Sequence, residues 1–238
     1  MSVLPRIFLV LIAAVMAGNG YAQLGPEIAR LHAERAGERL AALHSLRFEG
    51  RIFIAGETTQ FVAVAERPNR LRVESFTPQR RAVQAYDGVA PPWISHTDTG
   101  AGEPRAMTAA DAQDFIANAD FDGPLVDFAR KGNSVDYAGE EIVEGRRAQK
   151  LLLMNGRDEI FFLWVDGETH EVVRRLIYRA SKGRRVAVET RFKDFRPVGG
   201  VLQPFRVETS ADGELLYTMI IDRMEANVEV SPTAFTKP

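Results

Sequence analysis

The sequence predicts a mainly β (α+β) fold built on an antiparallel sheet, and three observations support this prediction. From Leu46 onward, apolar and polar residues alternate with the period of a strand. Dipeptides that favour tight hairpin turns recur through the C-terminal half. The intervals between them are too short for the crossover helices that parallel strands need. These turns are expected at Glu144-Gly145, Asn155-Gly156, Asp166-Gly167, Lys182-Gly183, Gly199-Gly200 and Asp212-Gly213.

In the N-terminal half, the spacing of apolar residues predicts first a helix and then a series of strands. Residues 26–43 have apolar residues at helical spacing, and Pro26 suits the first turn of that helix. The period then changes to two, which predicts a run of strands ending at the Asp87-Gly88 turn. The predicted strands are 46–54, 58–66, 70–76 and 82–86, with a short piece around Trp93.

The middle of the chain interrupts this β pattern once. Thr108 is a good N-cap for a helix over residues 109–118. A second short helix is expected over 122–129, ended by Gly132. Strands return from residue 134 as a regular meander, without a linker or a break in composition, so one domain over residues 23–238 is expected.

The first 22 residues have the pattern of a cleaved signal peptide. Arg6 precedes an apolar run over residues 7–17, and small residues at Gly20 and Ala22 predict cleavage before Gln23. This run is shorter than the roughly 20 residues that cross a bilayer. We therefore expect an exported, periplasmic protein that does not span the membrane. The chain has no cysteine, so it lacks the residue that would carry a lipid anchor.

Charge composition argues against nucleic acid as a partner. The chain has 30 Lys and Arg against 32 Asp and Glu, a formal charge of −2, whereas nucleic-acid-binding domains carry a basic face. Four arginine pairs are interpreted as solvent-facing strand or turn positions. They are Arg80-Arg81, Arg146-Arg147, Arg174-Arg175 and Arg184-Arg185.

Sequence motifs give no support for catalysis. The four histidines show no metal-ligand spacing, and no nucleophile elbow or phosphate-binding loop is present. Acidic residues are plentiful, and a carboxylate pair of the glycosidase type is not excluded by counting, but they lie at expected caps and turns. We therefore predict a protein that is not an enzyme and that needs no cofactor or metal.

Some predicted strands are apolar on both faces, notably residues 160–164 and 215–221. An antiparallel sheet with water on one face would alternate cleanly. Two apolar faces mean either that both are covered or that one lines a cavity. A packed core without a cavity remains an alternative.

Several segments, taken in order, resemble the LolA-like family of periplasmic outer-membrane lipoprotein-sorting proteins. One strand ends in Arg67-Pro68-Asn69, and the Asp87-Gly88 turn and Trp93 come after the next strands. The resemblance continues through residues 119–128, 132–139, 144–146, 165–169, 192–205 and 227–235, so it covers essentially the whole mature chain. Each motif is weak alone, and the order and spacing give the resemblance its specificity.

This resemblance implies an unclosed, strongly curved antiparallel β-barrel, with helices as a lid over a hydrophobic cavity that holds acyl chains. It implies a monomeric carrier for the acyl chains of lipoproteins or another lipid, moving them towards the outer membrane between an inner-membrane donor and an outer-membrane acceptor. Arg67 matches the arginine that keeps the family's lid shut. Leu71 matches a handover position that is aromatic in the family, and here it departs from that pattern.

Large apolar residues on the predicted strands and helices are the expected cavity lining, together with Arg67 at the lid. For each one, plain core packing is the competing interpretation, because a shift of one residue in register inverts the list. A sensor module of the same fold that recognises a protein partner is the alternative function. The expected ligand-binding residues are Arg67, Leu71, Phe48, Phe61, Phe76, Trp93, Phe128, Phe162, Trp164, Tyr217 and Met219.

Overall fold

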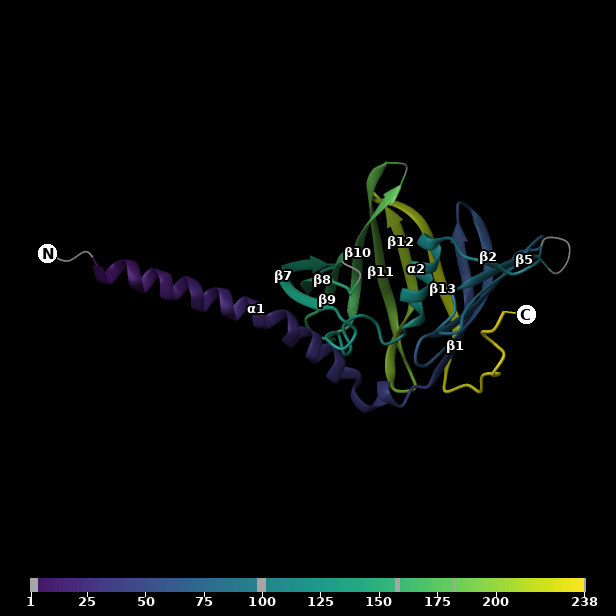
Figure 1. Cartoon of the computed structure of the whole chain (residues 1–238), viewed down its shortest axis with the longest axis horizontal. Coiled ribbons are helices and arrows are strands. Elements are labelled where there is room, and N and C mark those ends of the chain that lie inside the picture. Colours follow the sequence, from purple (N-terminus) through teal and green to yellow (C-terminus); the bar gives the residue numbers. More distant parts are fainter. Residues whose placement is uncertain (1–3, 98–101, 157–158, 182, 238) are drawn as a thin grey trace. The chain divides into compact units, whose positions relative to one another are not determined.

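The computed structural model describes residues 4–97, 102–156, 159–181 and 183–237. Strands dominate this part of the chain (Figure 1). The helices are α1 (Leu4–Ala41) and α2 (Ala109–Ala119). The strands are β1 (Ser45–Ile54), β2 (Glu57–Glu66), β3 (Arg70–Phe76), β4 (Arg81–Tyr86), β5 (Trp93–Thr97), β6 (Arg105–Ala106), β7 (Ser134–Val143), β8 (Arg146–Met154), β9 (Ile160–Asp166), β10 (Val172–Ser181), β11 (Arg184–Val198), β12 (Val201–Ala211) and β13 (Glu214–Ala226).

Hydrogen bonding joins the strands into one 13-stranded sheet in the order β6-β5-β4-β3-β2-β1-β13-β12-β11-β10-β9-β8-β7. The pairings given residue by residue are antiparallel, from β1 with β2 through β8 with β9. β6 and β7 end this order, so the hydrogen-bonded sheet is not closed. The prediction of a mainly β, antiparallel and unclosed architecture is confirmed.

The chain forms two compact units, which are described separately. The first unit contains Met1–Arg35 and Pro124–Arg185, and the second contains Ala36–Gly123 and Val186–Pro238. The first boundary lies close to Gly37, where α1 has non-helical angles (φ 51°, ψ −137°). A single domain over residues 23–238 stays a prediction.

In the first unit, α1 packs against the sheet through small and apolar side chains. A Cβ on Gly25 would lie only 2.7 Å from the Val135 carbonyl oxygen, so glycine permits a close approach of α1 to β7. The buried cluster beside it joins helix, loop and strand residues. Its members are Ile28, Ala29, Leu125, Val135, Leu151, Leu153, Phe161, Leu163 and Val165.

In the second unit, α2 begins at an N-cap and packs on the sheet. The Thr108 side chain accepts a hydrogen bond from the Asp111 amide at 3.2 Å, as predicted from the sequence. A second buried cluster joins α2 to the strands beneath it. Its members are Ala65, Leu71, Tyr86, Phe115 and Ala119.

Two predicted helices differ from the structure. α1 begins at Leu4, so Pro26 lies inside the helix instead of in its first turn. Residues 122–129 form consecutive turns and no helix, because Gly123 (φ 73°) and Asp127 (φ 50°) take left-handed backbone angles that interrupt helical hydrogen bonding. Strand 70–76 is confirmed with its predicted bounds, and the neighbouring strands begin one residue earlier than predicted.

Within the described ranges, no helix combines the length and the apolar character needed to cross a bilayer. The prediction of a signal peptide over residues 1–22 falls partly on residues outside the described ranges, and cleavage before Gln23 stays a prediction.

Candidate functional site

One face of the sheet in the second unit is apolar across β2, β1 and β13. Cross-strand partners share a face, and the register pairs Gly50 with Phe61, Ile52 with Met219 and Ile54 with Tyr217. Phe48 lies on the same face, with its ring centroid 6.0 Å from that of Phe61 in an edge-to-face arrangement. The structure therefore brings four of the predicted lining residues, Phe48, Phe61, Tyr217 and Met219, onto one surface.

This apolar face remains partly open in the whole chain. Phe61 and its neighbour Ile221 on β13 are buried, whereas other side chains of this face on β1 and β13 are half-buried and Ile54 is 47% exposed. Burying an apolar side chain is worth about 1.5–3 kcal/mol, so a half-exposed row of them has affinity for another apolar group. The half-buried members are Phe48, Ile52, Tyr217 and Met219.

The opposite face of the same strands is covered by ion pairs. Arg51 contacts Asp222 across β1 and β13 at 2.7 Å, and Arg47 contacts Glu49 along β1 at 3.2 Å. Solvated ion pairs contribute little to stability, about 0–1 kcal/mol each, but they mark this face as the one that meets water. The apolar face is therefore distinct from the solvent-facing side of these strands.

Arg67 joins three segments of the second unit. Its Nε donates to the Leu43 carbonyl oxygen at 2.6 Å, and Nη2 donates to the Leu40 carbonyl oxygen at 2.8 Å. Nη1 and Nη2 also donate to the two carboxylate oxygens of Asp122. The guanidinium lies over the Phe121 ring, 4.9 Å from its centroid. The rigid fork of arginine suits this combination of a bidentate carboxylate and two carbonyls.

Arg67 therefore connects the end of α1, the β2–β3 turn and the segment that follows α2. We call this set of contacts the Arg67 latch, with Leu40, Leu43, Phe121 and Asp122 as its other members. The Asp122 side chain is only 13% exposed, so this ion pair is more shielded from solvent than the Arg51–Asp222 pair on the solvent-facing side of the sheet.

Leu71 lies beneath α2. It is 5% exposed and belongs to the buried cluster with Phe115 and Ala119. At this position the side chain contributes to holding α2 on the sheet and does not reach the surface.

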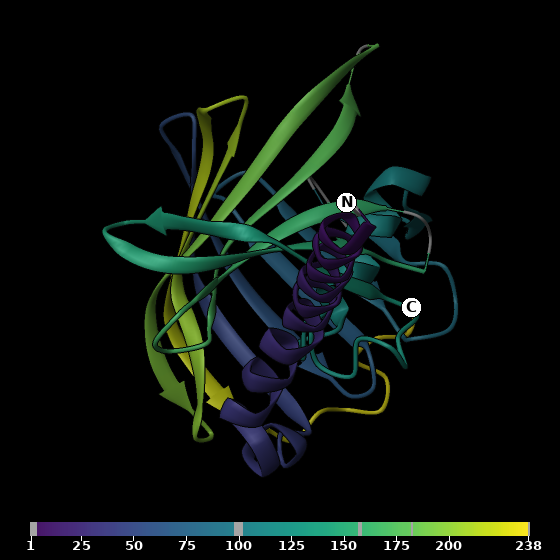
Figure 2. The same cartoon turned by 90° about the vertical axis from the view of Figure 1, so that its left-hand side faces the viewer.

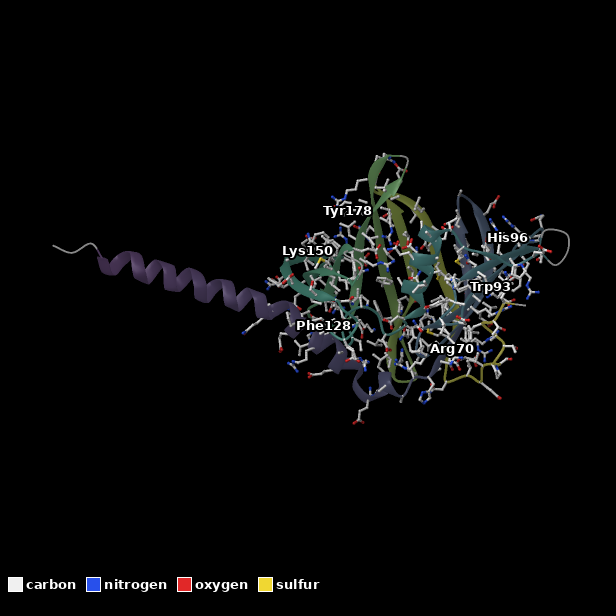
Figure 3. The ribbon with its side chains drawn as sticks, in the orientation of Figure 1. Arg70, Trp93, His96, Phe128, Lys150 and Tyr178 are labelled. Atoms are coloured by element: carbon white, nitrogen blue, oxygen red, sulfur yellow. The ribbon has the colours of Figure 1, made fainter. Side chains whose placement is uncertain are left out.

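Trp93 and Phe76 lie on the other face of the second unit. The register pairs Trp93 with Ala85, which is opposite in parity to Leu71 and its partner Tyr86. The Trp93 indole donates to the Phe235 carbonyl oxygen at 3.2 Å, so the C-terminal segment covers it (Figure 3). Phe76 pairs with Arg81, whose guanidinium lies 5.3 Å from its ring centroid.

The remaining predicted lining residues lie in the first unit. Phe128 is partly buried against the cluster that contains Ile28 and Leu125. Phe162 and Trp164 occupy the opposite face of β9 from Phe161 and Leu163, with ring centroids 6.2 Å apart. The predicted lining set is therefore spread over both faces and both units, and contact of each member with a ligand stays a prediction.

Sequence reasoning missed the partners of Arg67. Asp122 was interpreted as the start of a helix. The other two acceptors are the main-chain carbonyls of Leu40 and Leu43, which no residue type indicates because every residue has a carbonyl. A half-buried arginine does require an acidic partner. However, the chain offers 32 Asp and Glu, so the sequence alone could not select Asp122.

Among the residues that the structure describes, no three His, Asp or Glu side chains come together as a possible metal site.

The structure is similar to several solved structures of low sequence identity. A putative outer-membrane lipoprotein-sorting protein domain from Vibrio parahaemolyticus gives a TM-score of 0.64 at 8% identity, over 91% of this chain and 97% of that one. A LolA-superfamily protein from Nitrosomonas europaea gives 0.62 at 16% identity, over 88% and 97%. A DUF1329 family protein from Desulfovibrio piger gives 0.62 at 13% identity, over 91% and 97%.

These similarities show that the chain shares its fold with these proteins, in agreement with the fold that the resemblance to the LolA-like family implied. The sequence matches no family model and no curated protein. At these identities the likeness concerns the fold alone.

Proposed function

We propose that this protein is a periplasmic carrier that binds the acyl chains of a lipoprotein or another lipid on the apolar face of β1, β2 and β13. The observation that carries this proposal is the row of half-exposed apolar side chains on that face, opposite a face covered by ion pairs. Each buried CH₂ of an acyl chain contributes about 0.8 kcal/mol, so a long chain would bind without any polar contact.

The Arg67 latch supports a carrier more than a permanently packed core. It holds the segment after α2 to the end of α1 by polar contacts, while α2 itself packs on the same apolar face. In the proposed function, α2 and the Phe121–Asp122 segment act as a lid. Release of Arg67 from Asp122 would let the lid move without unpairing any strand.

Transfer towards the outer membrane, with an inner-membrane donor and an outer-membrane acceptor, is part of the same proposal. The buried position of Leu71 bears on it, because this residue cannot serve as an exposed handover contact. We therefore propose acyl-chain binding as the core activity and keep the cargo at the level of a lipid or lipoprotein. The protein needs no catalytic residue, metal or cofactor for this activity.

The first test is to identify what the protein carries. The protein is purified as cells produce it from the full sequence, extracted with organic solvent, and the extract is analysed by mass spectrometry. A fluorescent fatty-acyl probe is then titrated into the extracted protein. The proposal expects an acyl-containing lipid in the extract and saturable probe binding. Repeated extracts without lipid, together with no probe uptake, would rule it out.

Two neighbouring substitutions give a matched control for the site. Met219→Gln replaces an apolar side chain on the proposed face by a polar one of similar size, and it should weaken probe binding about tenfold. Thr218→Gln changes the adjacent residue, which pairs with Phe53 on the opposite face, and should leave binding unchanged. Equal weakening by both variants would place the probe somewhere other than this face.

A second candidate is a sensor module that recognises a protein partner. It is favoured by exposed apolar side chains at the neighbouring tips of the β1–β2 and β12–β13 hairpins, next to acidic Glu57 and Glu214. These side chains are Phe53, Ile54, Leu215 and Leu216. A stoichiometric protein partner in cells, with no lipid in the extract, would favour this candidate over the carrier.

A further inference from the structure

The first unit has an apolar surface on the face of β8, β9 and β10 that lies opposite the α1 cluster. Successive side chains on a strand alternate between faces, so Met154, Ile160 and Tyr178 point away from Leu153 and Phe161, which pack with α1. In the whole chain these three side chains are 43%, 50% and 38% exposed. Such a row of large exposed apolar residues is typical of an interaction surface.

The surface continues inward across the same three strands. Phe162 pairs with Leu152 on β8 and with Leu176 on β10, and all three are half-buried. Trp164 follows two residues later on β9 and is buried under charged side chains. We call Met154, Ile160, Tyr178, Leu152, Phe162 and Leu176 the outer apolar patch.

Cations surround the outer apolar patch. The Arg185 guanidinium lies over the Tyr178 ring, 3.9 Å from its centroid. Lys150, which is labelled in Figure 3, has its Nζ 5.0 Å from the ring centroids of both Phe162 and Trp164. The Arg174 guanidinium lies 4.1 Å from the Trp164 ring centroid. Glu141 faces this cluster, accepting from the Trp164 indole at 3.0 Å and contacting Lys150 at 2.8 Å.

The β10–β11 hairpin adds positive charge beside the patch. It is a long two-stranded ribbon (Figure 2), and Arg174 and Arg185 lie on its patch side, since Arg174 pairs with Trp164 and the Arg185 guanidinium covers Tyr178. Arg179 is balanced by Glu159 at 2.7 Å, and Arg174 by Glu141 at 3.5 Å. Arg184 and Arg185 are exposed. The surface is therefore apolar at its centre. Its border carries more cations than anions, with Lys150, Arg174, Arg184 and Arg185 against Glu141 and against the exposed Asp136, which pairs with Leu152.

We propose that the outer apolar patch and the β10–β11 hairpin dock this protein onto the surface of an anionic lipid bilayer. Apolar and aromatic side chains enter the boundary between headgroups and acyl chains, and cations near them interact with anionic headgroups. The cations at the border complement anionic headgroups, and the apolar centre suits the region just beneath those headgroups, so a bilayer is the occupant that we propose. The contact would be peripheral and reversible.

This proposal concerns the first unit and does not depend on the acyl-chain site of the second unit. It gives the protein a place to collect or deliver a lipid, but it would hold for any occupant of the apolar face around Met219. The two proposals can therefore fail separately.

The test measures binding of the purified protein to sedimented vesicles. One set of vesicles is pure phosphatidylcholine and the other is phosphatidylcholine mixed with phosphatidylglycerol. We expect clear sedimentation with the phosphatidylglycerol vesicles only, and weaker sedimentation as salt is raised, because salt screens the attraction. Equal sedimentation with both vesicles, or none with either, would overturn the proposal.

Paired variants locate the contact on the molecule. Arg184→Ala with Arg185→Ala removes two exposed charges and should lower partitioning into the anionic vesicles about 30-fold. Arg130→Ala with Arg147→Ala removes the same charge at side chains that are 81% and 79% exposed, and should leave partitioning unchanged. An equal loss in both double variants would show a non-specific effect of net charge and overturn the assignment.

A second pair of variants tests the apolar part. Ile160→Ser with Tyr178→Ser should also lower binding to the anionic vesicles, whereas the acyl-probe affinity should stay at the unmutated value. Vesicle binding that depends on Arg184 and Arg185 but not on Ile160 and Tyr178 would show purely electrostatic attraction to the headgroups. That result would contradict docking through the outer apolar patch. Met219→Gln should leave vesicle binding intact, which separates this outcome from failure of the acyl-chain site.

Discussion

The two units use the same strand architecture but distribute apolar residues differently. In the second unit, β1 places Ile52 on an apolar face and Arg51 in an ion pair with Asp222 on the other. In the first unit, β8 places Leu151 in the buried cluster with α1 and Leu152 on the opposite face, beside Phe162. Where apolar and polar residues alternate along a strand, the sequence identifies the face that meets water. Where both faces of a strand are apolar, the packing of helices or of an external partner determines which face is covered.

The largest expected effect is a difference in stability between substitutions on the two faces of β8. Leu151 is fully buried, so Leu151→Ala should lower the free energy of unfolding by about 3 kcal/mol. Leu152→Ala removes the same atoms from a half-buried position and should cost about 1 kcal/mol. Trp164 reports on this unit by fluorescence during urea unfolding if Trp93 is first replaced by phenylalanine. Equal losses would mean that both faces are equally covered.

The Arg67 latch should have an intermediate effect, confined to the second unit. Arg67→Ala leaves the Asp122 carboxylate and two carbonyls without their donor, and should destabilise the latch by about 2 kcal/mol. Hydrogen exchange of amides at residues 40–43 and 119–123 should accelerate, while that of the β8–β9 pair stays the same. Arg51→Ala breaks a solvent-exposed pair with Asp222 and should change the stability far less. A similar effect of both variants would contradict a special role for Arg67.

The smallest expected effect is a pH dependence in the first unit. Burial raises the pKa of Glu171 to about 7, against a smaller lowering by the Arg35 charge. The unfolded chain loses this proton near pH 4.5, so the folded state is progressively destabilised as pH rises from there to about 7. Because the site is partly solvated, we expect a loss on the order of 1 kcal/mol.

Replacing Glu171 by Gln isolates this contribution. The variant should match the unmutated protein at pH 4.5 and exceed it in the free energy of urea unfolding at pH 8. His32 acts in the opposite direction, because burial lowers its pKa and its neutral ring lies 2.7 Å from the His170 carbonyl oxygen. Because His32 is present in both proteins, its contribution cancels when the unfolding free energies of the Glu171→Gln variant and the unmutated protein are compared at the same pH. Parallel pH profiles would show that Glu171 ionises freely.

Local patterns predicted most of the secondary structure, because hairpin turns and strand alternation depend on neighbouring residues. Strand 70–76, the Thr108 cap and the antiparallel order all follow from such signals. The turns over residues 122–129 could not be predicted from such signals, because the positive φ of Asp127 is not evident from its residue type. Local signals also could not decide where α1 begins.

The candidate site was only partly predictable, because its geometry depends on register over long distances. Phe48 and Tyr217 are far apart in sequence, and they share a face only through the pairing of β1 with β13. Trp93 is as apolar as they are, but the parity of β5 directs it to the segment around Phe235. The predicted list of large apolar residues therefore combines side chains that lie on the apolar face with others that pack elsewhere, and their contact with a ligand stays a prediction.

The Arg67 latch has a consequence for how this fold can change over evolution. Two of its acceptors are main-chain carbonyls, at Leu40 and Leu43, and every amino acid supplies the same carbonyl. Positions 40 and 43 can therefore exchange side chains without removing the acceptors, provided that the backbone keeps its path. A fastening built on backbone atoms tolerates sequence drift, and it is consistent with an architecture shared at 8–16% identity.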